Sequence, residues 1–180
     1  MLSRLLGSDT ALDRIAAEIY GAIVARARSP VIYADFGVPD TVAGRFEMVV
    51  MHMAVAMDRF GAGSERERAI GQRVFDLFCG DMDTTLREFG VGDAVMGKRM
   101  KTMAQAFYGR SSAYMSAFAS GDRDELASAL GRNLFPGEDR PADGQLCDYA
   151  MLLQATFAAV APGGLERGAD AVPVIAERSG

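Results

Sequence analysis

The segment from residue 41 to 61, TVAGRFEMVVMHMAVAMDRFG, limits the possible folds more than any other part of the chain. It predicts a helix that Asp40 or Thr41 opens, and the centre of this helix is apolar on nearly every side. A helix of this kind is stable in water only when other elements cover it. Strand-like alternation of polar and branched apolar residues is scarce elsewhere in the chain. We therefore predict an all-α fold, a single-domain bundle of about five to seven helices around this buried central helix.

The chain divides into a leader, one helical domain and a tail. Its 180 residues suit a single domain with a sizeable core. We expect a leader over residues 1–9, the helical domain over 10–161, and a loosely ordered tail over 162–180, where no periodicity is found. Inside the domain, the hydrophobic spacing and the capping residues predict further helices over about 10–28, 64–89, 93–120, 122–134 and 146–161.

Local signals define two of the connections. Ser64 and Glu67 have the spacing of a capping box, which predicts a helix start at this point. The segment 30–40 carries prolines and a glycine among apolar side chains, so we predict an ordered loop without a regular element. Its aromatic residues, Tyr33 and Phe36, are expected to pack inward, because aromatic residues in connecting segments are more often buried than left exposed for a partner.

The composition disfavours several classes of function. A formal net charge of -5 and a pI near 4.9 disfavour a general nucleic-acid binder, which needs a surplus of Lys and Arg. Cys79 and Cys147 form no CxxC motif and are expected to be small buried hydrophobes. The chain contains no P-loop, dinucleotide fingerprint or nucleophile and base motif. We therefore predict no enzymatic activity, no catalytic residue, no metal site and no cofactor.

Two features leave alternatives open. Asp76, Asp81 and Asp83 could hold magnesium with water and support an enzyme, although such clusters are mostly solvated helix faces. His52 is the only histidine and interrupts the apolar segment. A lone histidine there is more often a hydrogen-bonded core or boundary residue than a metal or haem ligand.

No segment has the features of an export signal or a membrane span. The first residues lack the long apolar core of a signal peptide, and acidic residues occur early for a transit peptide. The longest uncharged apolar run near the middle, residues 48–57, is about half of what a membrane-spanning helix needs. We expect a cytoplasmic protein that is able to work at the inner face of the cytoplasmic membrane.

The predicted helix over residues 93–120, with Asp93 as its N-cap, has two contrasting faces. One is a packing face, which contains Met96, Met100, Met103, Phe107, Tyr114 and Phe118. The opposite one is a basic, hydrogen-bonding ridge, formed by Lys98, Lys101, Gln105, Tyr108 and Ser112. Lys98 and Lys101 are the only lysines of the chain. The ridge is either a solvated helix face or a binding surface.

Arg110 projects near the packing face and not on the ridge, by helical geometry. A guanidinium at such a position needs a carboxylate partner, because its desolvation would otherwise be unfavourable by several kcal/mol. Asp76, Asp83 and Asp93 are candidate partners, and we predict a structural ion pair between Asp93 and Arg110.

The run GVGDAVMGKRMKTMAQAFYGRSSAY, followed by LASALGRNLFPG, resembles the signature of the ubiquinol-cytochrome c chaperone family. The stretches VVMHMAVAMDRF and FDLFCGDMDTTLREFG are similar to the preceding part of that domain. The resemblance covers roughly residues 10–135. The first block is the specific one, because it combines glycines, lysines, an aromatic pair and an arginine at fixed offsets.

This resemblance implies an all-α assembly factor of respiratory complex III that binds newly made cytochrome b or another subunit of the complex. It also implies a small helical partner protein for mitochondrial members, whereas the lack of a transit segment makes this chain look bacterial. By position in the motif, it implies a partner-binding role for Lys98, Lys101, Tyr108, Gly109, Tyr114 and His52. Asp93 and Arg110 belong to the same motif.

The methionine-rich central helix supports one alternative from another class. A helical carrier could enclose a small hydrophobic ligand such as a quinone, a lipid or haem. A continuous apolar cavity would distinguish this carrier from an assembly chaperone.

Overall fold

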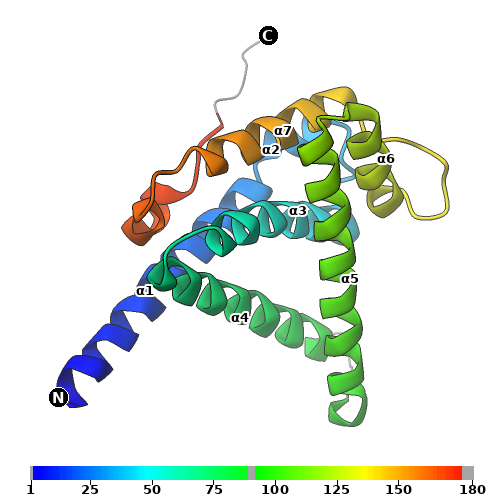
Figure 1. The fold of residues 1–180 in the computed structure, drawn as a ribbon. Coiled ribbons are helices and arrows are strands. Elements are labelled where there is room, and N and C mark those ends of the chain that lie inside the picture. Colours follow the sequence, from blue (N-terminus) through cyan, green and yellow to red (C-terminus); the bar gives the residue numbers. More distant parts are fainter. Residues whose placement is uncertain (1, 89–91, 176–180) are drawn as a thin grey trace.

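The computed structural model describes residues 2–88 and 92–175 and shows an all-α protein (Figure 1). Within these residues there is no strand, and the all-α prediction is confirmed. The described elements are α1 (Leu2–Ala27), α2 (Pro30–Ala34), α3 (Val42–Gly61), α4 (Glu65–Glu88), α5 (Asp93–Ser120), α6 (Arg123–Leu134), α7 (Gly144–Ala158) and the 3-10 helix η1 (Gly164–Ala171).

Helix α3 is the central helix, as the all-round apolar segment predicted. Every residue from Glu47 to Ala56 is buried. The helix packs against α1, α4, α5, α6 and α7, which cover its middle on all sides, whereas Val42, Arg45 and Asp58 toward its ends are exposed. At Gly71, a Cβ atom would come within 2.7 Å of the Phe60 side chain, so glycine allows α4 to approach α3 closely at this point.

The capping signals define most helix starts correctly. Thr41 accepts a hydrogen bond from the backbone N–H of Gly44, and Ser64 and Glu67 form the predicted reciprocal capping box. Asp122 also caps its helix, through the N–H groups of the first turn of α6. For α5 the cap prediction is wrong by one residue, because Gly92 takes the N-cap position and Asp93 is the first helical residue.

Two segments are more regular than predicted. Helix α1 begins at Leu2, so residues 2–9 are helical and not a separate leader. The segment 30–40 was predicted to lack a regular element, but Pro30 at the first helical position starts the short α2. The aromatics of this segment do pack inward, and the ring of Phe36 lies 5.6 Å from that of Tyr149.

The expected loosely ordered tail is wrong for residues 164–175. Leu165, Ala171 and Val172 are buried, and η1 packs against α1. A short 3-10 element has no α-helical periodicity, so its sequence resembles that of a loop. Residues 176–180 of the predicted tail lie outside the described residues.

A buried ion pair joins this C-terminal segment to the core. Arg59 of α3 donates to Glu67 of α4 at 3.2 Å and to the carbonyl oxygens of Val160 and Ala161 at 2.9 and 3.0 Å. Glu67 also accepts from the backbone N–H of Gly163 at 3.1 Å. Burial alone would raise the pKa of the Glu67 carboxyl, but the backbone donors and Arg59 hold this pKa below its ordinary value.

No helix in the described part of the chain is both long enough and apolar enough to cross a bilayer.

Replacing Glu67 by alanine should lower the free energy of unfolding by about 3–5 kcal/mol, because the Arg59 guanidinium would stay buried without its carboxylate. Urea unfolding followed by circular dichroism measures this change. Glu65→Ala is the matched control, since Glu65 is exposed in the same first turn and should change stability by at most about 0.5 kcal/mol. Equal effects of the two variants would contradict the role of the pair.

Candidate functional site

The far halves of α4 and α5 extend beyond the core as a helical arm. This α4–α5 arm comprises residues 79–88 and 95–106, and among these residues only Met96 is buried (Figure 1). Thermodynamic stability is lowest where few apolar side chains are buried. The arm is therefore the part of the fold that can adapt its shape most easily.

An apolar groove runs along the inner side of this arm. One part has a volume of about 180 Å³ and is lined mainly by apolar and sulfur-containing side chains from α3, α4 and α5: Phe46, Phe75, Phe78, Cys79, Met82, Met100, Met103 and Phe107. Methionine side chains are flexible and polarisable, so they can fit apolar partners of different shapes. Burial raises the pKa of the Cys79 thiol, which keeps this side chain neutral in the groove.

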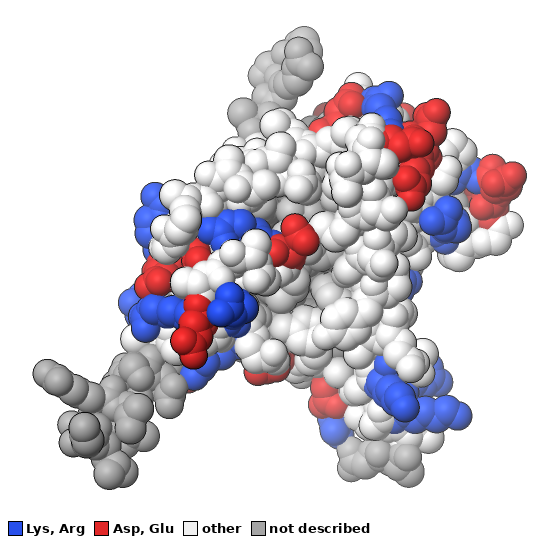
Figure 2. Space-filling view, in the orientation of Figure 1, with Lys and Arg blue, Asp and Glu red and all other residues white. Residues whose placement is uncertain are grey.

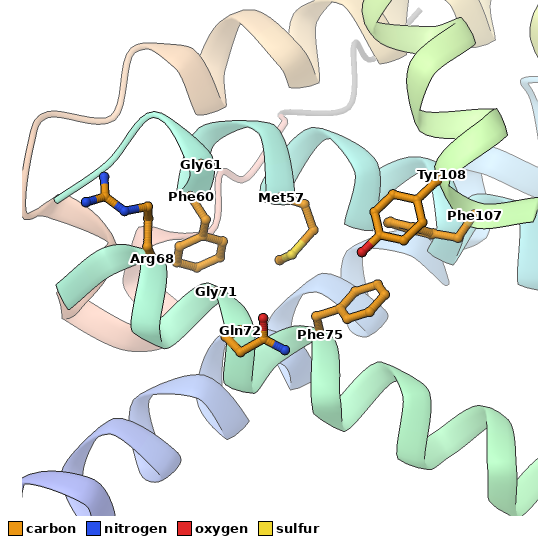
Figure 3. A pocket seen from close by; sticks show the side chains of 9 residues that line it. All are labelled: Met57, Phe60, Gly61, Arg68, Gly71, Gln72, Phe75, Phe107 and Tyr108. Atoms are coloured by element: carbon orange, nitrogen blue, oxygen red, sulfur yellow. The ribbon is translucent and has the colours of Figure 1, made fainter. Parts of the chain in front are cut away.

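A second hollow of about 200 Å³ continues from the first, and the two share Phe75 and Phe107 (Figure 3). Figure 3 shows Met57 pointing into this hollow between Phe60 and the rings of Phe75 and Tyr108. The two hollows together form one mainly apolar surface that reaches from α3 to the arm, to which Arg68 and Gln72 of α4 add polar groups. We call this surface the α4–α5 groove.

Tyr108 lies on an aromatic cluster at the centre of the groove. The ring of Phe107 lies 5.3 Å from that of Phe75 and 5.5 Å from that of Phe78, and Tyr108 lies 6.1 Å from Phe75. Tyr108 itself is 63% exposed. A rigid aromatic ring with a polar hydroxyl at the rim of an apolar surface is typical of a protein interaction site.

The predicted ridge is exposed along α5. Its members all face solvent: Lys98, Lys101, Gln105, Tyr108 and Ser112. Figure 2 shows Lys and Arg side chains gathered at the lower end of α5, next to a surface without charged groups. Gly109 is also exposed, and a Cβ atom there would meet nothing within 4 Å, so packing does not require glycine at this position.

Two residues with a predicted partner-binding role lie in the core. Tyr114 is 1% exposed, and its hydroxyl accepts a hydrogen bond from Asn133 at 3.1 Å. His52 is also 1% exposed and is hydrogen-bonded at both ring nitrogens, to the Met48 carbonyl at 2.8 Å and to the Tyr149 hydroxyl at 2.7 Å. Direct contact with a partner is therefore wrong for both. The helical spacing alone had placed Tyr114 on the packing face.

Arg110 has the intramolecular carboxylate that its position required, but the partner is Glu47 of α3. The guanidinium donates two hydrogen bonds to this carboxylate, at 2.9 and 2.8 Å. Burial raises the pKa of the Glu47 carboxyl, while Arg110 opposes this shift. The predicted Asp93–Arg110 pair is wrong, because Asp93 lies seventeen residues earlier on the same continuous helix, about 25 Å along its axis. The side chain of Asp93 is outside the described part of the structure.

Sequence reasoning missed Glu47 and the α4 side of the groove. Glu47 is a lone carboxylate beside a long apolar run, which is a readable signal for a buried pair. No sequence signal marks Phe75 and Met82 as groove residues. On an amphipathic helix, half-exposed apolar residues recur with the same spacing as buried ones.

The structure gives little support to the two alternative functions. No group of three or more potential metal ligands occurs in the part of the chain that the structure describes. Asp81 accepts from the Tyr20 hydroxyl at 2.7 Å, and Asp83 pairs with Arg87 at 2.7 Å. The two hollows of the groove are open to solvent and do not form the enclosed apolar cavity that a carrier would need.

Comparisons with known proteins agree on one family. The family model described as ubiquinol-cytochrome C chaperone matches residues 34–169. A solved structure, that of the Cbp3 homolog from Brucella abortus, is similar with a TM-score of 0.84 and 34% sequence identity, over 96% of this chain and 100% of that chain. A comparison with curated proteins gave no match. The family match extends past residue 135, where the sequence resemblance was expected to end, and includes α7.

The buried His52 should remain neutral in the folded protein well below its usual titration range. Burial lowers its pKa from 6.5 to about 4. Between these values the unfolded chain binds a proton that the folded chain does not, so His52 contributes stability above pH 6.5 that is lost as the pH falls toward 4, by about 3 kcal/mol. NMR can follow the imidazole without ambiguity, since it is the only one.

The same imidazole in the urea-unfolded chain is the internal control and should titrate near 6.5. The free energy of unfolding of the wild type relative to His52→Gln should fall by about 3 kcal/mol between pH 6.5 and pH 4. A midpoint near 6.5 in the folded protein would contradict the buried neutral histidine.

Replacing Arg110 by methionine should destabilise the fold by about 2–3 kcal/mol, because it leaves the Glu47 carboxylate buried and unpaired. The double variant Glu47→Gln/Arg110→Met should recover most of this loss, since neither position then carries a charge. Chemical denaturation of both variants measures the coupling. Additive losses would show that the pair does not act as a unit.

Proposed function

The chain belongs to the ubiquinol-cytochrome C chaperone family, and from this membership we propose that it binds newly made cytochrome b during the assembly of respiratory complex III. The family role as a chaperone for components of this complex follows from the membership itself. The identity of the client and the surface that meets it are the proposal.

The observation that carries the proposal is the open α4–α5 groove. A client with transmembrane helices exposes apolar surface that must be covered outside the bilayer. The groove offers an apolar surface of methionine and aromatic side chains, and α5 carries no charged residue from Thr102 to Gly109. A mainly apolar, adaptable lining suits an apolar helix. Its two charged members already have partners within the chain, since Arg110 pairs with Glu47 and Arg68 donates to the Gly63 carbonyl.

Tyr108 of the ridge and the adjacent Gly109 are the residues of α5 that we assign to the client. Tyr108 lies over the aromatic cluster and remains 63% exposed, so its ring is available for a partner. Gly109 lies beside it. A Cβ atom would fit at this position, so packing does not require glycine, and glycine in a helix interior makes the helix less stable than alanine would by about 1 kcal/mol. A flat surface beside an exposed ring allows a client backbone to approach closely.

Deleting the gene in its own host should lower the amount of assembled complex III and leave other respiratory complexes intact. Complementation then tests the surface. Tyr108→Glu should restore little complex III, because a charge in the groove rim should weaken client binding by at least about tenfold. Blue native electrophoresis and the spectrum of cytochrome b measure both results.

Leu152→Glu is the matched control, since Leu152 is an apolar residue of α7 that is 52% exposed. It should complement like the wild type. Unchanged complex III in the deletion strain would contradict the proposed function. Full complementation by Tyr108→Glu would contradict the assigned surface alone.

A further inference from the structure

Among the helices that the structure describes, only α5 carries a net positive charge. Helix α5 carries Lys98, Arg99, Lys101 and Arg110 and a single acidic residue, Asp93, although the whole chain has a net charge of -5. Lys98, Arg99 and Lys101 are exposed, and no acidic side chain in the described residues pairs with them. Arg110 is held by Glu47 and does not belong to this group.

These three residues form an amphiphilic end together with Val95. Val95 is 48% exposed and lies one turn before Lys98 and Arg99. We call these four residues the basic end of α5, which lies at the lower end of this helix in Figure 2. Lys98 is ten residues from Tyr108, about 15 Å along the helix, so the basic end is separate from the centre of the groove.

We propose that the basic end of α5 binds the surface of an anionic phospholipid bilayer. Lysine and arginine near an anionic leaflet are attracted to its headgroups, and their long side chains let the charge reach the phosphates while an apolar neighbour such as Val95 enters the interface. The cytoplasmic flanks of transmembrane helices carry an excess of Lys and Arg, so such a client would be repelled by this end and not bound by it.

The surrounding acidic groups offset only part of this charge, because Asp93 is the one acidic residue of α5 against Lys98, Arg99 and Lys101. On the last turns of α4, Asp83 is paired with Arg87, and Glu88 is exposed. Asp122 and Asp124 follow the opposite end of α5, roughly 30 Å of helix away from Lys101. Charges at that distance are screened, because the Debye length is about 8 Å at physiological ionic strength.

Bilayer binding through this end would place the α4–α5 groove next to the membrane. This consequence rests on the proposed function, because a groove next to the membrane is useful only for a client that is inserted into the bilayer. The lipid contact itself depends only on the charges and the exposure of the basic end. The two proposals can therefore fail separately.

Co-sedimentation with vesicles tests the lipid contact on the full-length chain. The wild type should bind vesicles of phosphatidylglycerol and phosphatidylcholine, should not bind pure phosphatidylcholine, and should be released by salt. Lys98→Ala/Lys101→Ala should weaken the partitioning by roughly 25-fold, at about fivefold for each lost charge. Both residues are exposed, so the fold should remain intact by circular dichroism.

The control variant is Arg28→Ala/Arg132→Ala, which changes the net charge equally at two exposed positions outside α4 and α5. It should change the partitioning by less than about twofold. Equal loss in both double variants, or equal binding to neutral vesicles, would overturn the proposal. So would binding to heparin without binding to vesicles, which would indicate an anionic macromolecule in place of the bilayer.

Capture of the client in neutral detergent separates the two proposals. We interpret the bilayer as the partner that the resemblance implied for Lys98 and Lys101, so Lys98→Ala/Lys101→Ala should still capture cytochrome b through the unchanged groove. If this variant lost the capture of cytochrome b but still bound vesicles, the division of α5 into a lipid-binding end and a client surface would be overturned. Loss of vesicle binding with intact capture is the expected result.

Discussion

The burial of α3 on all sides is the constraint on which the rest of the structure depends. Its apolar surface requires a complete shell of helices, but apolar contacts alone would allow several arrangements of that shell. Three buried polar residues of α3 each contact a different element: Glu47 binds α5, His52 binds α7, and Arg59 binds α4 and the segment before η1. Because unsatisfied buried polar groups are costly, each contact favours one placement of its neighbour.

These contacts also explain why the α4–α5 arm is only loosely supported. Glu67 ties the start of α4 to α3, and Arg110 ties the second half of α5 to it. Beyond Phe78 on α4 and before Phe107 on α5, neither helix has a described polar contact with α3, and their described apolar side chains other than Met96 are half-buried or exposed. The polar contacts thus separate a rigid core from an adaptable arm, and the groove lies where the two meet.

The sequence predicted what depends on a single element. The central helix, the bounds of α5, the capping box at Ser64 and the exposed ridge all follow from local spacing and residue type. The sequence did not predict features that form only where two elements far apart in the chain meet. The groove needs the angle between α4 and α5, and the partner of Arg110 is sixty-three residues away. Position in a family motif was also misleading for Tyr114, because a motif contains core residues as well as binding residues.

An assembly chaperone must hold its client and later release it, and the division between core and arm suits both steps. A rigid groove that matched one client helix closely would bind it tightly and release it slowly, since affinity differences arise mostly in dissociation. Flexible thioether side chains on a weakly supported arm become ordered when they bind. The conformational entropy that they lose offsets part of the favourable interaction energy. In the proposed role, the same methionines would widen the range of client shapes and limit the affinity, so that a client could move on to its partner subunits.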